Sequence, residues 1–141
     1  MIDLGTGTGI LAVAAARLGA TRVLAVDLNP LCVKTSKRNI ELNHLESVVE
    51  VLEGDAEDFV EKAADLVVAN SHFEVLKEMV EKESFRKTSW LILSGLMRSQ
   101  GKDIKARLER WGLTVVKEWD GEGTWVTILV SATPRSVTSD R

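Results

Sequence analysis

The sequence has a single cysteine, Cys32, among its 141 residues. One cysteine can form neither an internal disulfide nor a thiolate zinc site, so we predict no metal site and expect a reducing cytoplasm as the compartment. No apolar run approaches the roughly 18 to 20 residues that cross a bilayer. The first residues lack the basic lead of a signal peptide, so no membrane partner is expected. The formal net charge of −3 disfavours a broad nucleic-acid interface.

Short apolar segments alternate with helical patterns along most of the chain. The alternation occurs five times, and two further apolar segments joined by "DGEG" indicate a final hairpin. Such alternation is typical of an α/β fold in which a mostly parallel sheet has helices on both faces. A ligand of such a fold binds beyond the carboxyl ends of the strands. The final segment, "SATPRSVTSDR", is of low complexity and predicts a frayed end.

Two helix starts can be read from the sequence. Asn29 followed by Pro30 predicts a helix whose N-cap is the asparagine. Ser71 with Glu74 has the spacing of a capping box, which predicts a helix that starts at Ser71 and extends through "SHFEVLKEMVEKE".

The stretch "MIDLGTGTGIL" places three glycines between a predicted strand and a predicted helix. Glycine permits a tight turn and the close approach of a ligand to the backbone. The spacing is G-x-G-x-G, and Ile10 stands where the dinucleotide fingerprint has its third glycine, which counts against a nicotinamide-dependent oxidoreductase. A phosphate-binding G-x-x-x-x-G-K-[ST] motif is also missing. Asp3, directly before the loop, suits a cationic ligand better than a pyrophosphate.

Polar residues follow the next three predicted strands. Asp27, about 20 residues after the loop, can accept hydrogen bonds from both hydroxyls of a ribose. Asp55 can accept from an adenine amino group, or cap the helix that follows it, or do both. Asn70 either faces the reacting group or is a simple strand-end asparagine. His72 is a candidate general base or an ordinary residue of the first helical turn.

These motifs together resemble a known family. The string "IDLGTGTGILAVAAARLGATRVLAVDLNP" looks like the first two motifs of class I S-adenosylmethionine-dependent methyltransferases. More narrowly, it resembles the methyltransferases of ribosomal large-subunit protein eleven. The resemblance continues through "NIELN", "ADLVVAN", "LILSGLMRSQ" and "GEGTWVTILV", to about residue 130.

The resemblance implies a Rossmann-like, mostly parallel seven-stranded sheet whose last strand is antiparallel. It implies a methyltransferase domain over residues 1–132, with residues 133–141 as a disordered tail. It implies S-adenosylmethionine as cofactor and S-adenosylhomocysteine as product. Asn70 would lie at the methyl-transfer point, with His72 as a second catalytic residue. The implied cofactor-binding residues are Asp3, Gly5, Thr6, Gly7 and Gly9 around the methionine part, Asp27 and Leu28 at the ribose, Asp55 and Ala56 near the adenine, and Asn70.

The resemblance predicts transfer of a methyl group to an amine nitrogen of a protein. The family has an aliphatic residue after the asparagine, where this chain has Ser71, and a separate N-terminal recognition domain that we expect this chain to lack. Two alternatives remain open. One is a methyltransferase acting on a small molecule or a nucleic acid. The other is a cofactor-binding module without activity of its own, which serves as one subunit of a complex. Assembly as a homodimer or with a partner subunit is also left open.

Overall fold

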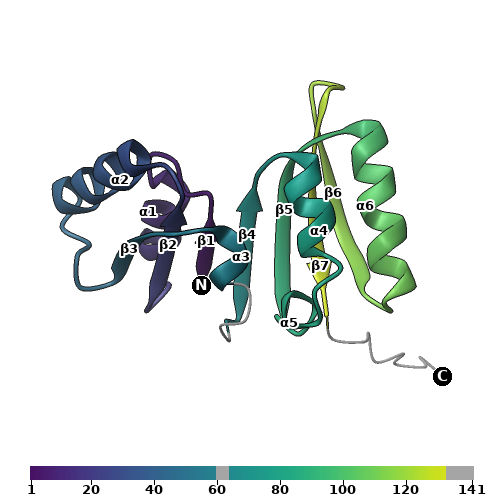
Figure 1. Cartoon of the computed structure of the whole chain (residues 1–141), viewed down its shortest axis with the longest axis horizontal. Helices are drawn as coiled ribbons and strands as arrows, with labels where there is room; N and C mark the ends of the chain where they lie inside the picture. Colours follow the sequence, from purple (N-terminus) through teal and green to yellow (C-terminus); the bar gives the residue numbers. More distant parts are fainter. Residues whose placement is uncertain (60–63, 133–141) are drawn as a thin grey trace.

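The computed structural model describes residues 1–59 and 64–132, so the predicted tail at 133–141 lies outside the described residues. Seven strands form one sheet in the order β3-β2-β1-β4-β5-β7-β6 (Figure 1). β1 to β5 pair in parallel, and β7 is antiparallel to both β5 and β6. This is the sheet that the sequence predicts. The strands are Ile2–Leu4 (β1), Val23–Asp27 (β2), Val49–Glu53 (β3), Leu66–Asn70 (β4), Trp90–Met97 (β5), Thr114–Gly121 (β6) and Trp125–Ser131 (β7).

Six helices connect the strands of the described chain. They are Ile10–Arg17 (α1), Pro30–Leu42 (α2), Ala56–Phe59 (α3), Phe73–Met79 (α4), Glu83–Arg86 (α5) and Arg98–Arg110 (α6). The predicted start of α2 is confirmed, because the Asn29 side chain accepts a hydrogen bond from the Leu31 amide at 2.9 Å. Its proline takes the first helical position, where no hydrogen bond is lost. None of the helices in the described ranges is long and apolar enough to span a membrane.

The capping box predicted at Ser71 and Glu74 is wrong. The N-cap of α4 is His72, whose side chain makes no capping hydrogen bond. The Ser71 amide instead donates to the Ser94 carbonyl at 3.3 Å. The backbone of Ser71 therefore still pairs with β5, and the helix begins later than the local pattern indicates. The predicted single helix is also interrupted, because α4 ends at Met79 and α5 is a separate short helix.

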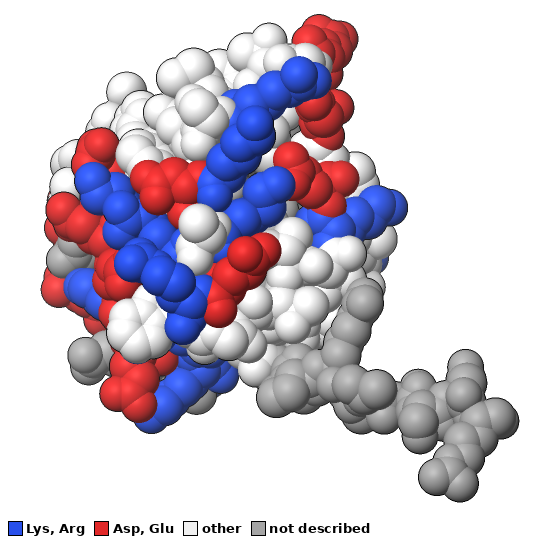
Figure 2. Space-filling view, turned by 90° about the vertical axis from the view of Figure 1, so that its right-hand side faces the viewer, with Lys and Arg blue, Asp and Glu red and all other residues white. Residues whose placement is uncertain are grey.

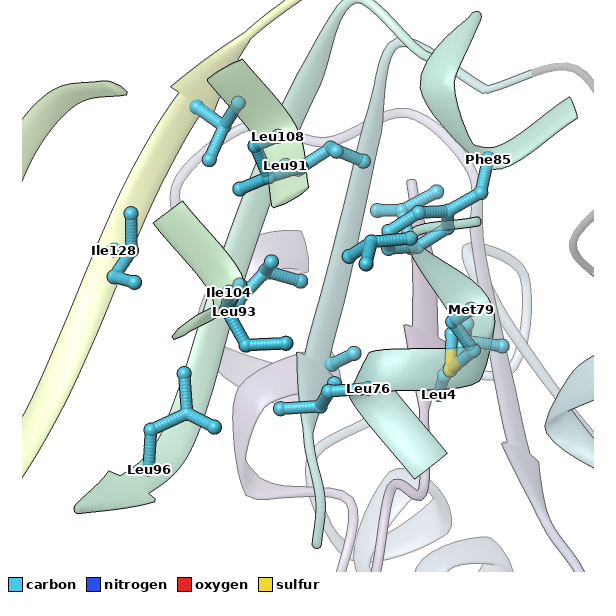
Figure 3. Packing of buried hydrophobic residues seen from close by; sticks show 14 of the residues in the cluster. Leu4, Leu76, Met79, Phe85, Leu91, Leu93, Leu96, Ile104, Leu108 and Ile128 are labelled. Atoms are coloured by element: carbon cyan, nitrogen blue, oxygen red, sulfur yellow. The ribbon is translucent and has the colours of Figure 1, made fainter. Parts of the chain in front are cut away.

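Two buried clusters lie on opposite faces of the sheet. The larger cluster packs β1, β4, β5 and β7 against α4, α5 and α6 (Figure 3). The smaller one packs β2 and β3 against α1 and α2. Neighbouring residues of β2 show the alternation, because Ala25 belongs to the smaller cluster and Val26 to the larger. Helices therefore pack on both faces of the sheet, and α1 and α2 cover β2 and β3 on one of them.

The outer surface beside α6 carries charges of both signs (Figure 2). Arg107 lies 3.0 Å from both Glu81 and Asp103. Lys105 pairs with Glu118 on β6, and Arg98 with Asp120. Three cations of this face, Arg98, Lys105 and Arg107, are thus paired with neighbouring carboxylates.

Candidate functional site

A glycine loop connects β1 to α1 at the carboxyl edge of the sheet. Gly5, Gly7 and Gly9 have φ angles of 72°, 60° and 82°, a region that L-residues with side chains rarely adopt. The amides of Gly5 and Thr6 both donate to the Val26 carbonyl at 2.9 Å. The loop is therefore held directly against the end of β2.

Asp27 links the glycine loop to the start of α2. One carboxylate oxygen accepts from the Gly7 amide at 2.9 Å, and the other accepts from the Asn29 amide at 2.9 Å. These two bonds set the plane of the carboxylate. Each oxygen keeps a further lone pair, so the group can also accept from a pair of vicinal hydroxyls. This geometry fits the predicted ribose role.

Asp3 lies beneath the glycine loop and is buried together with Thr6. The Thr6 hydroxyl donates to the Asp3 carboxylate at 2.7 Å. Burial raises the pKa of the Asp3 carboxyl above its ordinary value, the Thr6 bond opposes that shift, and the charge of Asp27 adds to it. A cation brought to the loop would stabilise the ionised form of Asp3. The pair thus supports the loop from inside, which the sequence did not indicate.

Ser36 and Asn39 of α2 hold the other side of the loop, and sequence analysis missed both. The Ser36 hydroxyl donates to the Gly7 carbonyl at 2.7 Å. The Asn39 amide group donates to the Thr8 carbonyl at 2.7 Å. With these carbonyls turned toward α2, the Thr8 amide between them points away from the helix. A weak signal was available, because Ser36 is a polar residue on the buried face of α2 that also contains Val33.

The adenine end of the predicted site lies beside Asp27. The Gly54 amide donates to the Asp27 carbonyl at 3.0 Å, so the ends of β2 and β3 are adjacent. Asp55 follows as an exposed residue, and Ala56 is the first residue of α3. Leu28 is 66% exposed at the same edge. An exposed leucine directly after Asp27 offers an apolar contact for a flat ring beside a hydrogen-bond acceptor.

Asn70 is brought next to the glycine loop by the pairing of β1 with β4. A Cβ atom added to Gly5 would lie 3.6 Å from the Asn70 carbonyl oxygen. Asn70 is exposed at the end of β4. His72 is also exposed, two residues further on. The structure therefore brings together the loop, Asp27 and Asn70, while the base role of His72 stays a prediction.

A groove of about 990 Å³ runs over the sheet from α1 toward Asn70. Its walls are apolar side chains of α1 and the sheet, among them Leu11, Val68 and Ile92. Asn70, Ser94 and Thr127 also line it. Within the described ranges, no group of three or more histidine, cysteine, aspartate or glutamate residues is placed to hold a metal ion.

Comparison with known proteins gives a family match over residues 1–133, to the model described as ribosomal protein L11 methyltransferase (PrmA). Curated relatives include the ribosomal protein L11 methyltransferases of Desulforamulus reducens, 38% identical over 130 residues, and of Pelotomaculum thermopropionicum, 41% identical over 128 residues. These alignments cover 90% and 89% of this chain but 42% and 41% of the relatives. The chain thus spans about two fifths of the length of the curated relatives it matches.

Solved structures show the same fold. The ribosomal protein L11 methylase of Lactobacillus delbrueckii subsp. bulgaricus superposes with a TM-score of 0.82 at 28% identity, over 92% of this chain and 68% of that one. TrmK of M. capricolum, solved with S-adenosylhomocysteine, superposes with a TM-score of 0.80 at 15% identity. That alignment covers 94% of this chain and 62% of the TrmK chain, and it supports the fold alone.

Proposed function

The chain belongs to the ribosomal protein L11 methyltransferase family of S-adenosylmethionine-dependent enzymes, and from this premise we propose how its own residues work. In this proposal, the carboxyl edge of β1, β2 and β3 binds S-adenosylmethionine, and a methyl group passes to an amine nitrogen of a protein beside Asn70. The acceptor we propose is ribosomal protein L11, the protein named in the relatives' descriptions.

One observation carries this proposal. The Gly7 amide bonds the Asp27 carboxylate at 2.9 Å, while Gly5 of the same loop lies against the Asn70 backbone. A single loop thus connects the group proposed for the ribose to the group proposed for methyl transfer. The buried carboxylate of Asp3 beneath that loop supplies negative charge where a ligand's ammonium group is expected.

When bound, S-adenosylmethionine supplies a methyl group on a sulfonium, which is already activated for in-line displacement by a nucleophile. The protein supplies proximity and orientation, which contribute up to about 7 to 11 kcal/mol in favourable cases. In the proposal, Asn70 accepts a hydrogen bond from the amine and directs its lone pair toward the methyl carbon. His72 accepts the proton that the amine loses. The loop amides and Asp27 hold the rest of the cofactor.

Calorimetric titration with S-adenosylhomocysteine tests the cofactor site. Asp27→Asn leaves only one acceptor oxygen for two backbone amides and the ribose. Hydrogen bonds to charged groups contribute about 1.5 to 3 kcal/mol, so we expect affinity to fall by about 10- to 100-fold. The control is Asp103→Asn, which removes a carboxylate paired with Arg107 on α6, far from the loop. Absence of binding by the unaltered protein, or equal affinity of the two variants, would contradict the site.

Transfer is tested with methyl-labelled cofactor and purified ribosomal protein L11. We expect label on L11 and none on L11 whose amines have been acetylated beforehand. Equal labelling of acetylated L11 would show that the acceptor is not an amine. Cofactor binding without any transfer, to L11 or to small molecules and RNA of a cell extract, would favour the alternative of a binding module that needs a partner.

A further inference from the structure

Strand β5 contains an irregularity directly beside Asn70. The pairing of β5 with β7 shifts register between Leu93 and Leu96. Gly95 lies within this bulge and has a φ of +83°. A bulge changes the direction of a strand locally and is often found next to functional residues.

The space above Gly95 is occupied by Asn70, the last residue of β4, and by Ser71 after it. A Cβ atom at position 95 would lie 2.8 Å from the side-chain oxygen of Asn70 and 2.8 Å from the Ser71 carbonyl oxygen. Both distances are shorter than real Cβ contacts. A side chain at residue 95 would therefore displace the Asn70 side-chain oxygen, which is the end of a flexible side chain, and the Ser71 carbonyl, which is backbone.

The bulge is tied to its surroundings on both sides. The Ser94 hydroxyl lies 2.7 Å from the Thr127 hydroxyl on β7. The Ser94 carbonyl accepts from the Ser71 amide at 3.3 Å. The backbone of Gly95 is thus held at a defined place between β7 and the end of β4, and the Asn70 side chain rests against it.

Comparison with Gly112 shows that a positive φ angle alone does not explain why residue 95 is a glycine. It has a similar φ of +75° at the end of α6, but a Cβ atom there would meet nothing within 4 Å. Gly112 is needed for its backbone angle, whereas Gly95 is needed for its angle and for the space that it leaves to Asn70.

We propose that Gly95 is a positioning residue for methyl transfer, because its bare backbone fixes where the Asn70 amide meets the acceptor. This inference rests on the proposed function of Asn70. A side chain at position 95 displaces the Asn70 amide and leaves the bond between Gly7 and Asp27 intact. We therefore expect the larger effect on transfer, because the contact between Asp27 and the glycine loop stays in place.

The experiment compares Gly95→Ala with Gly112→Ala, using purified L11 as acceptor. A displacement of about 1 Å at a reacting group can lower the rate about 10²-fold. We expect Gly95→Ala to lower kcat by that order while the Kd for S-adenosylhomocysteine stays within about twofold of the unaltered protein. Gly112→Ala is expected to retain kcat. Equal kcat in the two variants would overturn the inference.

A double-variant test separates positioning from a general structural effect. If Gly95 acts through Asn70, then Gly95→Ala added to Asn70→Ala lowers kcat no further than Gly112→Ala does in the same background. An additional loss as large as that in the native background would show that Gly95 acts by another route.

Two further measurements cover other outcomes. Should the unaltered protein methylate nothing, the proposed function fails, and NMR of the Asn70 side-chain amide still decides the inference. Its resonance must move in Gly95→Ala and stay in place in Gly112→Ala.

Should Gly95→Ala fail to fold, Thr127→Val replaces it, since this near-isosteric change releases Ser94 from β7. An unmoved Asn70 resonance in that variant contradicts the proposal.

Discussion

Ser36 offers the sharpest test of how the cofactor loop is built. Its side chain is fully buried in α2, and its hydroxyl lies within hydrogen-bond distance of the Gly7 carbonyl at 2.7 Å and the Cys32 carbonyl at 2.8 Å. The Cys32 carbonyl is inside α2, where the helical ladder also serves it. Ser36→Ala therefore deprives mainly the Gly7 carbonyl of a partner.

The size of the effect follows from that lost partner. Loss of a hydrogen bond to this half-buried acceptor costs about 0.5 to 1.5 kcal/mol, which lowers the melting temperature of a domain of this size by about 2 to 5 °C. The freed peptide between Gly7 and Thr8 must also be reordered when a ligand binds. If reordering this peptide costs about 1.4 kcal/mol of binding free energy, the affinity for S-adenosylhomocysteine falls about tenfold.

Thr35→Ala is the matched control. Thr35 precedes Ser36 on α2, and its hydroxyl donates to the Leu31 carbonyl at 2.8 Å, on the exposed side of the helix. The control thus removes a hydroxyl with the same i−4 bond but leaves the glycine loop untouched. Thermal unfolding and calorimetric titration of both variants provide the readouts. If Ser36→Ala binds the ligand as tightly as Thr35→Ala, the contact from α2 does not shape the loop, and the reasoning is refuted.

Two further predictions concern stability. Burial raises the pKa of the Asp3 carboxyl, so the folded protein holds this proton more tightly than the unfolded chain does. The protonated carboxyl therefore stabilises the fold in full below the ordinary aspartate pKa, and this stabilisation is lost as the pH rises through the raised value. Asp3→Asn should therefore melt above the unaltered protein at neutral pH and lose that advantage in acid, and a pH-independent difference would contradict this. Phe85→Ala empties a fully buried site under α5 and should lower the free energy of unfolding by about 3 to 5 kcal/mol in urea titrations. A loss below about 1 kcal/mol would show that the cluster collapses onto the cavity.

Local sequence patterns were sufficient for the order and type of most elements. Apolar runs ending at glycine or aspartate gave the parallel strands, and Asn29 before Pro30 marked the start of α2 correctly. The pattern at Ser71 misled, because its amide bonds to Ser94, a residue on another strand. A capping pattern describes only what nearby residues can do, and a competing partner from elsewhere in the fold can override it.

The sequence by itself determined which residue types stand at the strand ends. The glycines after β1, Asp27, Asp55 and Asn70 could be identified without a structure, since a parallel sheet gathers the ends of its strands at one edge. The family match over residues 1–133 and the strand order of the sheet confirm the predicted class and fold, while the roles of these residues stay predictions.

Only the tertiary structure decided how that edge is held in shape. Ser36 reaches the loop across 29 residues of sequence and Asn39 across 31. Gly95 leaves space for Asn70 from a different strand, and its bulge arises from pairing with β7. These contacts depend on how helices and strands pack together. Such packing is set by the whole buried core, so no local pattern of residues encodes it.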